Sequence, residues 1–234
     1  MLELFLYTLL SGITIFLGGL AANYFNHHVE ASPVKNEITH FMMSFGGGVI
    51  LSAVVLVFVP KALAILDVIS LSLSFLSGAI VFFFLDRYLH KKAGKVGMLL
   101  AMVMDYLPES IILGSLFVAD PSAALFLAIF MGLQNFPEAF TAFRNLVLSG
   151  FGIKRTLMTF FFLSFLGFFA ALFGYFVMRD HPDYTAYLMI FSSGGILYLL
   201  FQDISPEAKL KGVYITGMGA VLGFLLGLIG EMLL

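Results

Sequence analysis

Eight apolar runs, each about as long as a membrane-spanning helix, follow one another along this chain of 234 residues. About 20 apolar residues are needed to cross the hydrocarbon core of a bilayer as a helix. Short polar connections separate the runs, which we place at residues 2–24, 37–59, 63–86, 96–117, 122–144, 155–178, 184–203 and 212–233. The pattern predicts an all-α integral membrane protein with eight transmembrane helices.

The composition agrees with this class. Hydrophobic residues make up 61% of the chain and charged residues 11%, and the mean hydropathy is +1.04. A water-soluble globule of this size would need more polar surface. No segment resembles a separate soluble domain, so we expect residues 1–234 to form a single transmembrane domain. The first run carries Glu3 instead of a basic leader, and we expect it to be retained as a span.

Several functional classes are disfavoured by what the sequence lacks. There is no cysteine, which removes disulfides and thiolate metal sites from consideration. The net charge is only −2, and no basic stripe interleaved with aromatic residues suggests nucleic-acid binding. No Ser/His pair or metal-plus-base set has catalytic spacing, so we expect no enzymatic activity and no catalytic residues.

Lysine and arginine are concentrated on one side of the predicted spans. Ten of the 12 fall in connections after the first, third, fifth and seventh spans, and the other side holds only Lys61 and Arg179. Cytoplasmic loops carry an excess of these residues. We therefore expect a multi-pass protein of the cell membrane with both termini outside the cytoplasm.

Short motifs recur in the two halves of the chain. Two glycines followed by two aliphatic residues occur at Gly47–Ile50 in the second span and at Gly194–Leu197 in the seventh, and a Pro-x-Ala sequence closes each of these spans. We place the prolines of these Pro-x-Ala sequences, Pro60 and Pro206, in the connections that follow the two spans. A Pro-Glu pair occurs in both the fourth span and the fifth. Because the paired spans run in opposite directions, the pattern predicts inverted-topology repeats, with a substrate site near their interface.

The two Pro-Glu pairs are each preceded by a further polar residue. Asp105 lies four residues before Glu109 in the fourth span. Gln134 lies four residues before Glu138 in the fifth. Residues four apart share one face of a helix. Three acids and an amide are therefore expected to converge on two neighbouring helices.

Carboxylates at this depth require compensation. One carboxylate at the centre of a bilayer costs about 2.5 to 3.5 kcal/mol, so three would cost roughly 8 to 10 kcal/mol unless protonated, hydrated or neutralised. A bound divalent cation would neutralise them, and Pro108 and Pro137 would free backbone carbonyls nearby. A single such acid can be purely structural, but two matching helices favour a cation site.

At these residues the chain resembles the ZIP (Zrt-, Irt-like protein) family of divalent metal-ion transporters, as a divergent member of the prokaryotic type. Gln134–Glu138 matches the Gln-Asn-x-Pro-Glu of the family's fifth helix, although Ala139 replaces the Gly that follows. Asp105–Ser110 keeps only the Pro-Glu of the fourth-helix motif His-Asn-x-Pro-Glu-Gly. The resemblance implies eight helices in a 3+2+3 arrangement of inverted repeats.

The resemblance also implies a set of metal ligands. Carried over by position, they are Asp105, Glu109, Gln134, Asn135 and Glu138. The family's second metal position loses two ligands, because Tyr106 stands in place of an Asn and Gly167 in place of a Glu. We therefore predict a single-metal site. Its oxygen ligands suit manganese, magnesium or calcium and leave iron and zinc open.

The function implied is transport of a divalent metal of the zinc, iron or manganese class toward the cytoplasm. The metal is the transported substrate and not a resident cofactor, the partners are the ion and the lipid bilayer, and relatives form homodimers. Two alternatives stay open. One is a transport-inactive metal sensor or binding protein, which the missing His and second site favour. The other is a proton-coupled carrier of another solute, with the glutamates as proton relay and Lys61 as their charge partner.

Overall fold

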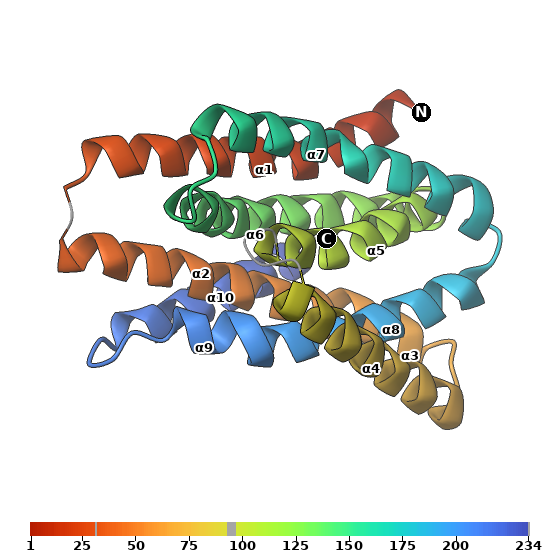
Figure 1. The fold of residues 1–234 in the computed structure, drawn as a ribbon. Helices are drawn as coiled ribbons and strands as arrows, with labels where there is room; N and C mark the ends of the chain where they lie inside the picture. The colour runs from red at the N-terminus through yellow and green to blue at the C-terminus, as the bar shows by residue number, and fades with distance from the viewer. Residues whose placement is uncertain (31, 93–96, 234) are drawn as a thin grey trace.

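The computed structural model describes residues 1–30, 32–92 and 97–233, and in these ranges it is a bundle of helices without strands (Figure 1). Eight stretches are long and apolar enough to cross a membrane. This confirms the predicted all-α class with eight spans. Lys95, one of the cations counted in the third connection, lies outside the described residues.

The spans consist of the following helices. The first four are α1 (Leu2–His28); α2 (Pro33–Ala53), the π-helical η1 (Val54–Phe58) and α3 (Val59–Leu63); α4 (Val68–Lys92); and α5 (Gly97–Ala119). The last four are α6 (Pro121–Leu148); α7 (Ile153–Phe173) with the π-helical η3 (Gly174–Met178); α8 (Pro182–Leu199), the π-helical η4 (Leu200–Ile204) and α9 (Ser205–Ala208); and α10 (Ile215–Met232).

The second and seventh spans are longer than the sequence predicts. Each continues through a proline, Pro60 or Pro206, that we expected to lie in a connection. A π-helical segment precedes each proline-bearing helix, η1 before α3 and η4 before α9. Proline lacks a backbone donor and is tolerated in the first turn of a helix. The local change from α to π hydrogen bonding therefore lets each span continue to its end.

At two connections, a capping residue determines where the next helix begins. The Ser32 side chain accepts a hydrogen bond from the Lys35 backbone nitrogen at the start of α2. Asp120 does the same for Ala123 at the start of α6. A proline follows each cap directly, and this combination favours helix initiation.

The packing of the helices relates the two halves of the chain. Helix α1 packs on α6 as α7 packs on α5, and α2 packs on α10 as α8 packs on α4. Helix α2 also packs on α6 as α8 packs on α5, and the contacts of α1 with α7 and of α5 with α6 join each helix to its own counterpart. This is the set of contacts that inverted repeats around a central helix pair produce.

The central pair occupies the interior of the bundle. In Figure 1, α5 and α6 run through the middle, with α1 and α7 on one side and α2, α8 and α10 on the other. Within an apolar stretch of 18 residues in each helix, 72% of the stretch is buried in α6 and 11% in α4. Polar side chains on α6 are therefore shielded from lipid by the surrounding helices.

Glycines let several of these helices approach closely. A Cβ added at Gly78 of α4 would run into the backbone oxygen of Phe191 on α8, and one at Gly114 of α5 into that of Ala171 on α7. Helices in a bilayer associate through close van der Waals packing, because lipid tails are as apolar as the side chains they replace. These glycines therefore set the spacing of the bundle.

This spacing can be tested with a matched pair of glycines. We expect Gly78→Ala to lower the unfolding free energy by about 1 to 3 kcal/mol, because two helix backbones must separate. Gly217→Ala on α10 meets nothing within 4 Å and should be neutral or stabilising by up to about 1 kcal/mol through helix propensity. Thermal unfolding in detergent measures both, and equal effects would contradict the packing described.

Candidate functional site

The predicted ligands lie on the central helices α5 and α6 and are buried. Glu109 and Gln134 are 0% exposed, Asn135 1% and Asp105 5%. Both carboxylate oxygens of Glu138 are also buried. The polar groups on the two Pro-Glu helices are therefore inside the protein, away from lipid and bulk water.

One hydrogen bond joins the two helices within this cluster. The Gln134 side-chain nitrogen donates to Glu109 Oε2 at 2.7 Å. The two residues are 25 positions apart in sequence. The structure thus brings together the first residue of the fifth-span motif and the glutamate of the fourth.

Four other oxygens of this cluster are buried without a hydrogen-bond partner among the described residues. They are Glu109 Oε1, Gln134 Oε1 and both Glu138 carboxylate oxygens. Buried polar atoms in native proteins nearly always have a partner, because an unpaired one loses its hydration without compensation. An ionised carboxylate and an amide oxygen only accept. A proton donor or a cation is required at these atoms.

The carboxylates also interact electrostatically. Glu109 is close enough to Asp105 for Coulomb repulsion, and Glu138 is close enough to both. Asp105 accepts a hydrogen bond from the backbone nitrogen of Tyr106 at 2.9 Å. The ion pairs found among the described residues join other groups. Positive charge brought between the three carboxylates would therefore be strongly favoured.

The ligand set is not closed into a coordination shell. Within the described ranges, no three His, Asp or Glu side chains are arranged to hold a metal ion. The side-chain nitrogen of Gln134 points at Glu109, and the side-chain oxygen of Gln134 has no hydrogen-bond partner among the described residues. The oxygen atoms of these residues are suitable ligands for a divalent cation. For all of them to bind one ion, the side chains would have to rotate.

Asn135 is directed to a different helix. Its side-chain nitrogen donates to the Ser11 backbone oxygen of α1 at 3.2 Å. This bond attaches α6 to α1 three residues before Glu138. Among the five predicted ligands, Asn135 is the one whose observed contact is structural.

Tyr106 fills the space beside Glu109 between α5, α1 and α7. Its side chain is 1% exposed. A Cβ added at Gly12 of α1 or Gly167 of α7 would run into its hydroxyl oxygen. The hydroxyls of Tyr106 and Ser110 are buried without a hydrogen-bond partner among the described residues. A larger side chain at position 167 is therefore incompatible with Tyr106 in this position.

Lys61 lies at the end of the bundle that carries few basic residues. Its amine is 2.6 Å from Asp120 Oδ2, and the two side chains are 33% and 40% exposed. The proton-coupled alternative made Lys61 a charge partner of the glutamates, whereas the structure pairs Lys61 with Asp120, the residue that caps α6. Its charge is thus balanced outside the carboxylate cluster.

Arg144 connects three helices at the opposite end of α6. From the sequence it counted only as one of the ten basic residues that predict the orientation. Its Nε donates to Asn26 Oδ1 of α1 at 3.1 Å, and its Nη1 donates to the Thr39 hydroxyl of α2. One guanidinium therefore holds α1, α2 and α6 together. A single Arg at the end of an apolar run was the only sequence signal for this contact.

No protein-family model matches this chain, and no curated protein sequence matches it. The case for a function therefore depends on the residues and geometry described above.

The Lys61–Asp120 pair makes a pH-dependent contribution to stability. The hydrogen bond and charge of Lys61 lower the pKa of Asp120 below its ordinary value, so the stabilisation is present above the unfolded pKa of about 3.9 and is lost as pH falls below it. Asp120→Asn keeps a capping oxygen and removes the charge. We expect it to cost less than about 1 kcal/mol at neutral pH, because the pair is partly exposed.

Thermal unfolding in detergent between pH 7 and pH 3 measures this contribution. The difference between wild type and Asp120→Asn should shrink toward the acid end, and Lys61→Met should show a similar deficit at neutral pH. A deficit of Asp120→Asn that is the same at both ends of the range would show that the charge is not its cause.

Proposed function

We propose that this chain is a membrane carrier for divalent metal ions, with the ion bound between α5 and α6 as the transported substrate. The observation that carries the proposal is the group of four buried oxygens on Glu109, Gln134 and Glu138 that have no hydrogen-bond partner among the described residues. Carboxylate and amide oxygens are ligands for hard and borderline divalent cations. These oxygens lie on α5 and α6, the central pair of helices, and the other spans surround this pair.

Charge balance supports a divalent ion over a monovalent one. Three ionised carboxylates around one divalent ion leave a net charge of −1, and the neutral Gln134 adds a ligand without adding charge. A buried charge cluster left uncompensated would oppose folding. The expected metals are those of the zinc, iron or manganese class, and an oxygen-only site favours manganese among them.

The proposal includes one ion per chain. Tyr106 occupies the space beside Glu109 and excludes a side chain at position 167. A second ion there would have neither room nor the ligands that the resemblance to the ZIP family would require. Transport toward the cytoplasm, residence in the cell membrane and a homodimeric state are carried over from that resemblance and stay predictions.

Transport requires that access to the site alternate between the two membrane surfaces. Polar contacts join helices near both ends of the bundle: Lys61 with Asp120 at one, and Arg144 with Asn26 and Thr39 at the other. The π-helical segments η1 and η4 lie at corresponding places in the second and seventh spans. Such segments interrupt the regular helix ladder and are frequent at functional bends. We propose that the bundle rocks around the buried site at these segments.

The direct test is metal uptake into proteoliposomes. We expect saturable uptake of one or more divalent metals by wild type, and loss of uptake in Glu109→Gln, Glu138→Gln, which removes two charges and preserves shape. Asp86→Asn is the matched control, since Asp86 is a buried acid of α4 that accepts a hydrogen bond from Tyr198 outside the site. It should retain uptake.

The alternatives give different results in the same assay. Metal binding at the glutamates without uptake by a folded protein would favour the transport-inactive sensor. Proton flux that needs the glutamates, with no metal binding at all, would favour a proton-coupled carrier of another solute. Uptake unchanged in the double variant would remove the proposed site.

Position 105 should control which metal is preferred. We expect Asp105→His to raise binding of zinc relative to manganese, because imidazole is a better ligand for zinc than for manganese. Asp105→Asn keeps an oxygen at the same place and serves as the control. In this variant we expect manganese still to compete with zinc for the site. Competition binding of the two metals measures the ratio, and an unchanged ratio in Asp105→His would show that residue 105 is not a ligand.

A further inference from the structure

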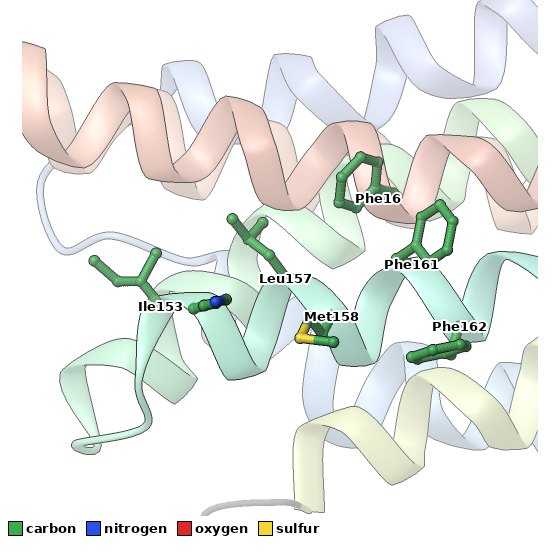
Figure 2. A pocket seen from close by; sticks show the side chains of 7 residues that line it. Phe16, Ile153, Leu157, Met158, Phe161 and Phe162 are labelled. Carbon is green, nitrogen blue, oxygen red and sulfur yellow. The ribbon is translucent and has the colours of Figure 1, made fainter.

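An apolar groove lies between α1 and α7, and none of the residues that line it belongs to the carboxylate cluster (Figure 2). Its volume is about 570 Å³, within the range of about 300 to 1,000 Å³ that small-molecule sites occupy. It is lined by Phe16, Ile153, Lys154, Leu157, Met158, Phe161 and Phe162. Six of these side chains are apolar, and Lys154 is the one charged member.

The groove has a charged end and an apolar end. Lys154 is the second residue of α7, and Phe161 lies seven residues further along the helix, or about 10 Å at a rise of about 1.5 Å per residue. Phe161 rises toward Phe16 of α1 in Figure 2, and the two rings are in edge contact with their centroids 5.5 Å apart. The distribution of Lys and Arg places the charged end at the cytoplasmic membrane surface.

The two neighbouring cations at this end differ in their surroundings. The guanidinium of Arg155 lies over the Phe151 ring, 6.0 Å from its centroid. Lys154 lines the groove, and its amine has neither a hydrogen bond nor an ion pair with another described residue. Lys154 is therefore available to an anion that enters the groove from the membrane surface.

We propose that this groove binds one anionic phospholipid, with an acyl chain along Leu157, Phe161 and Phe16 and the phosphate on the amine of Lys154. A free anion would leave the apolar wall uncovered, and an uncharged apolar molecule would leave Lys154 without a partner. Basic pockets between transmembrane helices on the cytoplasmic side recognise anionic head groups. The lipid would bridge α1 and α7, which belong to different repeats, and the inference does not depend on metal transport.

The chain contains no tryptophan, so a single introduced tryptophan reports on the lipid that contacts it. Phe161→Trp places this reporter in the groove at a side chain that is 40% exposed, and Phe169→Trp places it on the same helix outside the groove at one that is 65% exposed. Each variant is reconstituted in vesicles containing phospholipids with brominated chains, which quench tryptophan on contact. Because the bromines are on the chains, free phosphate gives no signal.

We expect brominated phosphatidylglycerol to be preferred over brominated phosphatidylcholine by about fivefold at position 161, the factor that one lysine near an anionic head group supplies. Position 169 should show little preference. Adding Lys154→Ala to Phe161→Trp should abolish the preference, whereas adding Arg155→Ala, which removes the same charge one residue away, should preserve it.

Two results would overturn the inference. One is no preference at position 161, which would mean that the groove holds bulk lipid only. The other is an equal loss of preference in the two charge variants, which would indicate a general effect of surface charge. Met158→Trp, at a groove side chain that is 52% exposed, repeats the measurement if Phe161→Trp does not fold.

Discussion

The burial of acidic and amide oxygens between α5 and α6 is the constraint on which the rest of this structure depends. Glu109 and Gln134 are fully buried and bonded to each other, and the oxygens left over have no partner among the described residues. Such atoms are tolerated inside a membrane protein only where other helices shield them from lipid. The position of α6 at the centre of the bundle meets that requirement.

Close packing of helices holds this arrangement together. Apolar attraction does not hold helices together in a bilayer, so contact must come from shape. Gly78 and Gly114 allow backbones to touch where any side chain would separate them. Packing is equally close beside the carboxylates, where the absence of side chains at Gly12 and Gly167 leaves the volume that Tyr106 fills. Packing thus limits how many ligands and ions the centre can hold.

The two ends of the central helix α6 are secured by different chemistry. At one end an ion pair joins Asp120 to Lys61, and at the other the guanidinium of Arg144 bonds to two neutral oxygens on α1 and α2. The first contact responds to acid, whereas arginine stays charged at all accessible pH values. A carrier built on this frame would therefore have one end more sensitive to pH than the other.

The sequence by itself determined the class of the fold and indicated which residues form its polar centre. Eight apolar runs of spanning length, and Asp105, Glu109, Gln134 and Glu138 at helical spacing, were sufficient, because both depend on local periodicity and on the cost of burying charge. Only the tertiary structure decided that Gln134 bonds to Glu109, that Asn135 turns to Ser11 and that Lys61 pairs with Asp120. These contacts join residues that are far apart in sequence, and which helix faces meet is set by close packing, which no local pattern records.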